Sequence, residues 1–380
     1  MGGGSSSNIS EIRPNVIINN NSSLRTGGGL WSQGNASFNN VDIIGNTGGS
    51  GVHVSSGNGS FTDVRIMENS GDGIYTFQGS NLYTRVSIIN NDGQAMKIDW
   101  TASPSFQNST IFGNIGSIAT DVGIPTIEYS NISNNGIGLI NSNNSNMIDA
   151  TNNYWGHSSG PYHPSQNSSG QGDSVNAFVN IDPWLTTPNT DAPPIPAQNL
   201  KLDSQTVTSA TFSWDASEIG DLAGYKFYYD TDSSGYPYAN SVDLGNVVTK
   251  SLTGLTTGKT YYVAVTTYDT DGNESWYSKE VSVTMNNTPV IAAVSDVTIN
   301  EDESSTVTLS ATDADGDAIT YSAVSDTNAI TVSVSSETLT LTPTANWNGS
   351  SVITAIASDG SAKDSTSFKL TVTSVNDAPT

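Results

Sequence analysis

The segment VDIIGN at residues 41–46 decides the fold class, because its pattern returns at intervals of 22 or 23 residues as VRIMEN at 64–69 and VSIINN at 86–91. A repeat of roughly 20–25 residues with short alternating runs is typical of a solenoid. A single coil cannot bury its valines and isoleucines, whereas stacked coils bury them in one core. The asparagine at the end of each segment tolerates a left-handed backbone and can stack its amide between coils. The repeat therefore predicts a coiled parallel sheet.

A conspicuous aromatic segment, NNYWGH at residues 152–157, is followed by GPYHP and DPWL within the next 28 residues. Together with the repeat, it resembles the closing coil of bacterial right-handed parallel β-helix proteins of the pectate-lyase-like type. The resemblance implies a β-helix over residues 1–188, with a cap at residues 152–186 that covers the exposed sheet edge. Residues 1–28 enter as repeat-like sequence without a recognisable first cap, so we expect this domain to be N-terminally truncated.

A proline-rich linker, DAPPIP at residues 191–196, precedes a region of short alternating strands. That region resembles a fibronectin type III domain, and the resemblance implies a seven-strand sandwich over residues 192–285. Trp214 matches the core tryptophan of the family, and Tyr261, six residues after Leu255, matches its tyrosine corner.

Apolar residues alternate with threonine and serine through the last third of the chain, which predicts a further two-sheet sandwich over residues 287–380. The unit ends in VNDAPT at residues 375–380 and resembles the bacterial cadherin-like tandem repeats. The chain stops where the next copy would begin, so we expect neighbouring repeats of a longer parent chain as partners. The fold class is accordingly all-β, a right-handed parallel β-helix followed by two immunoglobulin-like sandwiches in tandem.

Cadherin-type domains hold calcium at their junctions, and the resemblance implies candidate metal ligands in this last unit. The candidates all carry a side-chain oxygen and are Glu301, Asp313, Asp315, Asp359, Asn376 and Asp377. Ca²⁺ prefers about six to eight oxygen ligands, and few basic residues compete for these carboxylates. Asn287 stands where the family pattern has an aspartate. Two interpretations stay open: a Ca²⁺ site, or solvated turns on a sandwich that folds without metal.

One outward row of the solenoid is a candidate binding surface. Its members occupy equivalent positions of successive coils, or lie two residues further along the strand, and are Trp31, His53, Tyr75, Lys97 and Phe77. Strands of a sheet lie about 4.8 Å apart, so these side chains form an aromatic and polar stripe that suits a polysaccharide. The alternative is a surface ladder that stacks on itself and binds nothing.

The sequence assigns no catalytic residue. Asp42 with Arg65 and Asp63 with Arg85 have the spacing of ion pairs between neighbouring coils. The paired aspartates, the Gly-His-Gly segment and the calcium-binding acidic cluster of enzymes with this fold have no match. The cap histidines at positions 157 and 163 lack an obvious third metal ligand, which favours a role in the cap.

The amino-acid composition excludes several kinds of binding partner and of chemistry. The chain has 36 acidic and 12 basic side chains, a formal net charge of −24 and no cysteine. The charge argues against nucleic-acid partners, and the missing cysteines exclude disulfide scaffolds and thiol chemistry. No apolar run approaches the roughly 18 residues of a membrane span. The start of the chain has no signal-peptide pattern, which we interpret as truncation.

These features predict a fragment of a modular bacterial protein at the cell surface or outside the cell, of an adhesion or glycan-binding type. Its expected partner is a polysaccharide or another cell-surface or matrix ligand, and its expected cofactor is Ca²⁺. The first alternative is a polysaccharide lyase or glycoside hydrolase with its catalytic face on the β-helix. The second alternative is a passive structural stalk. Fold alone does not decide between them, because function depends on the site.

Overall fold

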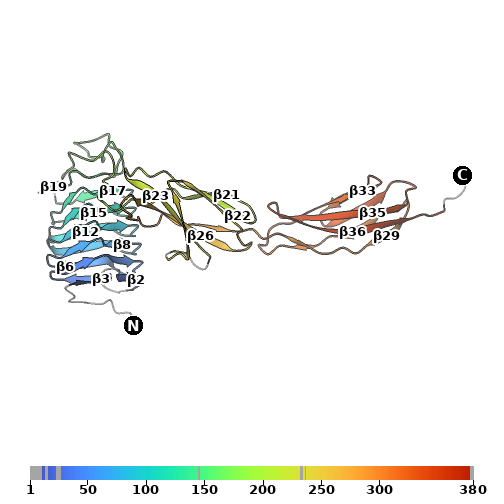
Figure 1. Ribbon diagram of the computed structural model, residues 1–380, viewed down its shortest axis with the longest axis horizontal. Coiled ribbons are helices and arrows are strands. Elements are labelled where there is room, and N and C mark those ends of the chain that lie inside the picture. The colour runs from blue at the N-terminus through green and yellow to red at the C-terminus, as the bar shows by residue number, and fades with distance from the viewer. Residues whose placement is uncertain are drawn as a thin grey trace.

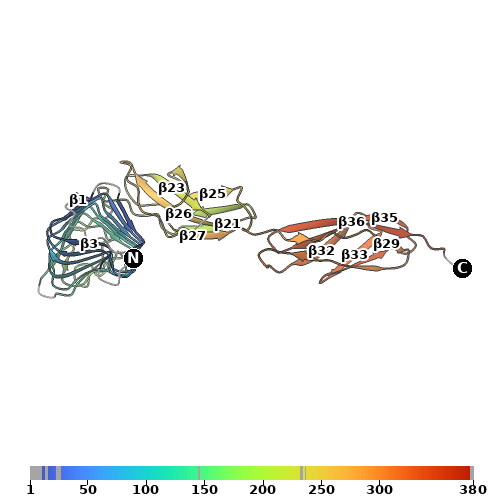
Figure 2. The ribbon, with the colours of Figure 1, turned by 90° about the horizontal axis from the view of Figure 1, so that it is seen from below.

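The computed structural model describes residues 11–12, 16–22, 27–143, 146–231, 234–235 and 237–376. Three units follow one another: a coiled solenoid, then two β-sandwiches that extend away from its side, as Figure 1 and Figure 2 show. The described part of the chain is all-β, and it contains no helix that could cross a membrane.

Each coil of the solenoid contributes one strand to each of three parallel sheets, and about six turns stack in this way. Sheet A contains β3 (Gly27–Gln33), β6 (Ser50–Ser56), β9 (Ile74–Gly79), β12 (Met96–Ala102), β15 (Ile118–Thr120) and β18 (Leu139–Asn141). Sheet B contains β1 (Glu11–Ile12), β4 (Ser37–Asn39), β7 (Ser60–Thr62), β10 (Leu82–Thr84), β13 (Ser105–Gln107), β16 (Thr126–Glu128), β19 (Ile148–Asp149) and β20 (Val179–Asn180). Sheet C contains β2 (Val16–Asn19), β5 (Val41–Ile44), β8 (Arg65–Met67), β11 (Ser87–Ile89), β14 (Thr110–Phe112) and β17 (Asn131–Ser133).

The solenoid core consists of ladders of equivalent residues. Ile43 pairs with Ile66, and Ile66 pairs with Ile88, so the predicted repeat is confirmed in register. Sheet B adds an aromatic ladder that the sequence analysis did not find. Its rings stack with centroids 4.8, 4.8 and 4.4 Å apart, in the order Phe38, Phe61, Tyr83 and Phe106.

A buried asparagine ladder joins the coils at the end of sheet C. The Oδ1 atom of Asn69 accepts hydrogen bonds from the backbone N–H and the side-chain amide of Asn46, both at 3.0 Å. Asn91 accepts the same pair of bonds from Asn69, and Asn114 accepts them from Asn91. These amides satisfy backbone groups that the turn would otherwise leave buried and unpaired.

The aromatic segment after β19 closes the solenoid. Trp155 is fully buried and belongs to the solenoid core, and Trp184 packs against the same core. His163 is also buried, and its Nδ1 accepts hydrogen bonds from the backbone N–H groups of Ser165 and Gln166. These contacts bury apolar surface at the last coil, and His163 satisfies two backbone N–H groups there.

The first sandwich packs a three-stranded sheet on a four-stranded one. Its strands are β21 (Lys201–Gln205), β22 (Ser209–Ser213) and β25 (Thr249–Thr253) in one sheet, and β24 (Asn240–Gly245), β23 (Leu222–Asp230), β26 (Thr260–Asp269) and β27 (Val281–Thr284) in the other. Trp214 lies buried between the sheets. The Tyr261 hydroxyl accepts a hydrogen bond from the Thr256 N–H at 3.0 Å, as expected for a tyrosine corner.

The second sandwich has the same layered arrangement. Its strands are β28 (Val290–Ile291) with β31 (Ala311–Thr312); β29 (Val297–Asn300), β36 (Lys363–Thr373), β35 (Gly349–Ser358) and β32 (Thr320–Ser325); and β30 (Ser305–Thr308), β34 (Thr338–Pro343) and β33 (Ile330–Ser335). Strand β29 pairs in parallel with β36, while the other pairs in this unit are antiparallel.

An apolar stripe on the outside of sheet C binds the first sandwich to the solenoid. This docking stripe is formed by one residue from each of four coils: Ile44, Met67, Ile89 and Phe112. It forms one buried cluster with Tyr154, Ile195 and Trp276. Figure 1 shows sheet C, marked by β2, β8 and β17, on the side of the solenoid next to β23. The contact fixes the first sandwich against several coils at once.

The two expected ion pairs are confirmed, and they also belong to this contact. Arg65 lies 2.6 Å from Asp42, and its guanidinium lies 5.7 Å from the ring centroid of Trp276. Arg85 lies 2.9 Å from Asp63 and donates hydrogen bonds to the Asp191 carbonyl at 2.6 Å and to Asn273 Oδ1 at 2.9 Å. Each aspartate therefore orients an arginine that contacts the linker or the first sandwich.

Trp276→Ala is expected to release the first sandwich from the docking stripe. The indole is 3% exposed, and its Nε1 donates a hydrogen bond to Glu68 Oε1 at 3.0 Å. Removing a buried tryptophan costs about 3–5 kcal/mol. We expect a lower denaturation midpoint and a larger radius of gyration by small-angle X-ray scattering. Tyr262→Ala, on the same sandwich but outside the cluster, serves as the control. An unchanged scattering profile for Trp276→Ala would show that this side chain does not hold the contact.

Candidate functional site

Sheet A brings the predicted outward row into register. Trp31 pairs with His53, His53 with Tyr75, and Tyr75 with Lys97. The preceding residue on each strand is buried in the core, which turns the row away from it. His53 is itself only 7% exposed, so it lies beneath its neighbours and offers little surface to a ligand. The accessible part of the row therefore comes from the other members.

Tyr75 is the centre of the row. Its ring centroid lies 4.8 Å from that of His53, and the Lys97 Nζ lies 5.2 Å from the ring centroid of Tyr75. Its hydroxyl donates a 3.0 Å hydrogen bond to Asp99 Oδ2, and Lys97 Nζ lies 3.4 Å from the same oxygen. Phe77, two residues along β9, stacks on Trp100 of the neighbouring strand with centroids 5.6 Å apart. The structure thus brings the predicted residues together with Asp99, which the repeat also places two residues along its strand from the row, and it adds Trp100.

Burial shifts the pKa values of three side chains in or beside the outward row. Burial, assisted by the hydrogen bond to the Asp99 carboxylate, raises the pKa of Tyr75 to about 12. Burial lowers the pKa of His53, which keeps the imidazole neutral at pH 7. Burial also raises the pKa of Asp72, and the Gln94 backbone N–H and the Lys97 charge oppose that shift. At neutral pH the Tyr75 and His53 rings at the centre of the row are therefore uncharged.

The candidate calcium ligands occupy the two opposite ends of the second sandwich. Asp359 lies just before the start of β36. Glu301 lies at the other end of that strand, where its backbone N–H donates a hydrogen bond to the Thr373 carbonyl. Strand β36 has eleven residues, and at about 3.3 Å per residue it separates these ends by roughly 36 Å. Glu301 accepts a 2.7 Å hydrogen bond from the Val375 N–H, next to Asn376, while Asp377 lies outside the described residues.

At the end that faces the first sandwich, three carboxylates converge. Asp313, Asp315 and Asp317 each place an oxygen within 4.8 Å of the others. Asp313 Oδ2 is buried and has no hydrogen-bond partner among the described residues. Asn287, at the position where an aspartate was expected, donates through its backbone and side-chain N–H groups to Asp315 at 2.6 and 2.8 Å. Asp317 was not among the predicted ligands, although it continues the DxD spacing by one more step.

The cap histidines hydrogen-bond to groups of their own turns. His157 Nδ1 accepts a 3.1 Å hydrogen bond from the Ser159 N–H, and His163 is held by its own turn. The metal-type cluster found among the described residues contains neither of them. Both imidazoles accept hydrogen bonds from backbone N–H groups in the cap.

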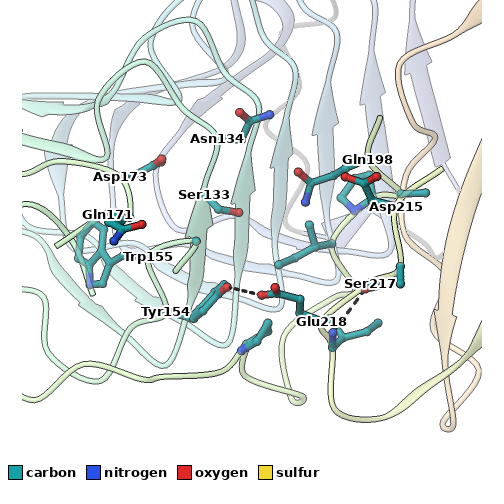
Figure 3. Close-up of a pocket in the computed structure, with 18 residues that line it drawn as sticks. Ser133, Asn134, Tyr154, Trp155, Gln171, Asp173, Gln198, Asp215, Ser217 and Glu218 are labelled. Carbon is teal, nitrogen blue, oxygen red and sulfur yellow. Dashed lines mark hydrogen bonds between the residues drawn. The ribbon is translucent and has the colours of Figure 1, made fainter. Parts of the chain in front are cut away.

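A polar cleft of about 370 Å³ lies where the cap meets the first sandwich (Figure 3). Asn134 and Asp173 line it from the solenoid, and Asp215 and Glu218 line it from the sandwich. The Tyr154 hydroxyl donates a 3.1 Å hydrogen bond to Glu218 across the contact, and burial raises the pKa of Tyr154 to about 12. Sequence reasoning missed this cleft because its residues belong to two units whose contact has no local pattern.

Comparison with known families defines the three units. Family models match residues 26–168 as a right handed beta helix region, residues 193–284 as a fibronectin type III domain, and residues 286–373 as a bacterial Ig domain. The chain therefore carries a right-handed β-helix, a fibronectin type III domain and a bacterial immunoglobulin-like domain, in the predicted order. The two sandwich types are typical of extracellular proteins.

Individual relatives overlap with the chain only in part. The chain is 36% identical over 112 residues to Exoglucanase B of Cellulomonas fimi, which is 29% of this chain and 9% of that protein. Similar solved structures include the third fibronectin III domain of a human protein, with 23% identity, a TM-score of 0.21 and coverage of 24% of this chain and 82% of that chain. Another is a fibronectin type-III domain of human fibronectin type III domain containing protein 3, with 19% identity, a TM-score of 0.22 and coverage of 25% and 87%.

Asp72→Asn is expected to stabilise the protein at pH 7 but not at pH 3. The raised pKa means that Asp72 contributes most to stability below its unfolded value of 3.8, and that this contribution is lost as the pH rises through the folded pKa. Asparagine can still accept the 2.8 Å hydrogen bond from the Gln94 N–H. Melting temperatures across pH 3–8 measure the effect, with the exposed Asp92→Asn as control. A constant difference between variant and wild type across this range would refute it.

Proposed function

We propose that this chain belongs to a modular extracellular or cell-surface protein whose β-helix binds a glycan along the outward row of sheet A. The observation that carries the proposal is the continuous contact of Tyr75 with His53, Lys97 and Asp99 in register across neighbouring coils. Aromatic faces beside a few fixed polar groups are the surface that sugar rings need, since a sugar has both C–H faces and hydroxyl edges. The two sandwiches then act as spacers or attachment modules.

A catalytic role for the same face is the second candidate. Lys97 and Asp99 could transfer protons to a bound sugar, and the relative named Exoglucanase B is an enzyme by its name. However, Lys97 and Asp99 lie 3.4 Å apart and neutralise each other, which favours a binding role over acid–base chemistry. The overlap with that relative covers 9% of its length, so it supports the enzymatic alternative only weakly.

Trp31→Ala and Tyr75→Ala are expected to weaken binding to insoluble glycans about tenfold each, as is typical when a central aromatic contact is removed. Pull-down of the full chain on cellulose, xylan, mannan and chitin measures the loss. Tyr162→Ala, an exposed cap residue, is the matched control. New reducing ends or unsaturated products during incubation would favour the enzymatic alternative. Absence of binding to every glycan would favour a passive stalk.

We further propose that the three carboxylates of residues 313, 315 and 317 bind Ca²⁺ at the junction of the two sandwiches. The buried, unpartnered oxygen of Asp313 is the group that most needs a cation, because a buried carboxylate oxygen without a partner is costly. In the linker between the sandwiches, Asn286 donates a hydrogen bond to Asp359 and Asn287 donates one to Asp315. The carbonyl groups of these two asparagines are therefore near the candidate ligands. Glu301, Asn376 and Asp377 would contribute to a second site shared with a following repeat.

Ca²⁺ is therefore expected to stabilise the second sandwich. With a dissociation constant in the range of about 0.1–1 mM for extracellular modules, 10 mM Ca²⁺ would add about 1–3 kcal/mol. Calorimetric melting of the full chain with Ca²⁺ or with a chelator measures the gain. Asp313→Asn with Asp315→Asn should abolish it, whereas the exposed Glu337→Gln should not. An identical melting profile with and without Ca²⁺ would contradict the proposal.

A further inference from the structure

Strand β12 contains a bulge beside the outward row. Ile98 pairs with Thr76 of β9 and Thr101 pairs with Gln78, so Asp99 and Trp100 together lie opposite the single residue Phe77. A bulge of this kind bends the strand and redirects the side chains that it carries. The extra residue is Trp100, which the outward row does not include.

The backbone at Trp100 is strained. Its φ angle is +50°, in the left-handed region that a bulky side chain rarely adopts. Most of the other non-glycine residues with positive φ are asparagines and aspartates, which tolerate that region. Strain of this type persists only where the surrounding structure holds it, and it is concentrated at functional sites.

The side chain of Trp100 is presented to solvent. It is 57% exposed, whereas large aromatic residues of the solenoid core are buried. The Phe77 ring stacks against it at 5.6 Å with an interplanar angle of 29°, which supports one face of the indole. The exposed fraction leaves the opposite face available, so the pair forms a fixed aromatic platform.

Polar groups precede Trp100 on β12. Asp99 is the residue before Trp100. Its Oδ2 atom accepts a hydrogen bond from the Tyr75 hydroxyl and forms an ion pair with Lys97. Its Oδ1 atom has no hydrogen-bond partner among the described residues, and the Lys97 side chain is 47% exposed. One free acceptor and one ammonium donor therefore lie on β12 within three residues before Trp100, and both contact Tyr75.

We propose that Trp100, Asp99 and Lys97 form a subsite for one pyranose ring of a neutral glycan. The C–H face of the sugar stacks on the indole, and its hydroxyl groups donate to Asp99 Oδ1 and accept from Lys97 Nζ. The ligand is neutral because Asp72 and Asp99 place two carboxylates beside one ammonium group, and because a net charge of −24 repels polyanions. This subsite rests on the proposed glycan binding along sheet A. It specifies both the position at which a sugar ring binds and the class of that sugar.

The test is calorimetric titration of the full chain with cellohexaose, xylohexaose and mannohexaose, and with oligogalacturonate as the acidic probe. At least one neutral hexasaccharide is expected to bind. Trp100→Asn should weaken that binding by about tenfold or more, because asparagine tolerates the left-handed backbone but removes the platform. Trp100→Phe keeps a stacking ring and should stay within about threefold of wild type. Tyr129→Ala is the matched control, since Tyr129 is 46% exposed with a φ of +53° on a different part of the coil.

The outcomes separate the subsite from the general function. If Trp100→Asn binds the neutral sugar as tightly as wild type, or Tyr129→Ala loses as much, the subsite is refuted while glycan binding stands. If only oligogalacturonate binds, the neutral class is refuted. If wild type binds none of the probes, glycan binding and the subsite both fail. A melting temperature of Trp100→Asn close to that of wild type confirms that any loss of binding reflects the missing indole.

Discussion

The buried amide-to-amide hydrogen bonds between successive coils are the interaction on which the rest of the solenoid depends. Each asparagine of the ladder binds both the backbone and the side chain of its equivalent one coil away, so a coil cannot shift by one residue without breaking both bonds. Asn114 donates in the same way to Asn135, the last asparagine, which in turn donates to the Asp173 carboxylate, where the ladder ends. Because register is fixed in this way, equivalent residues form straight rows, which produce the core, the docking stripe and the candidate binding surface.

The sequence allowed prediction of each unit and of the inward rows, because a repeat of 22 or 23 residues and alternating strands are local patterns. The docking stripe was missed for a physical reason. Its residues directly follow the inward ones, as in Ile43-Ile44 and Ile66-Met67, and two adjacent apolar residues in a strand indicate burial on both faces. That signal was present in the sequence, but the partner that covers the outer face lies about 200 residues later, at Trp276.

The sequence also allowed prediction of part of the candidate binding surface. Trp31, Tyr75 and Lys97 were placed in one row by counting, and the structure has them in that row. Trp100 could not be placed by counting, because the bulge inserts one residue and shifts it out of the repeat. The proposed calcium ligands came from a family resemblance, and the convergence of Asp313, Asp315 and Asp317 required the geometry of a loop.

The contact of the first sandwich with four coils also determines how the molecule carries mechanical load. The linker adds to it, since Asn189 is hydrogen-bonded to Asn131 and Asn108 of the solenoid. A pull on the second sandwich therefore enters the solenoid from the side and is shared by several coils, instead of reaching the last coil alone. Bonds loaded together in shear resist far more force than bonds opened one after another. An attachment through the far sandwich would thus leave the coils stacked under tension.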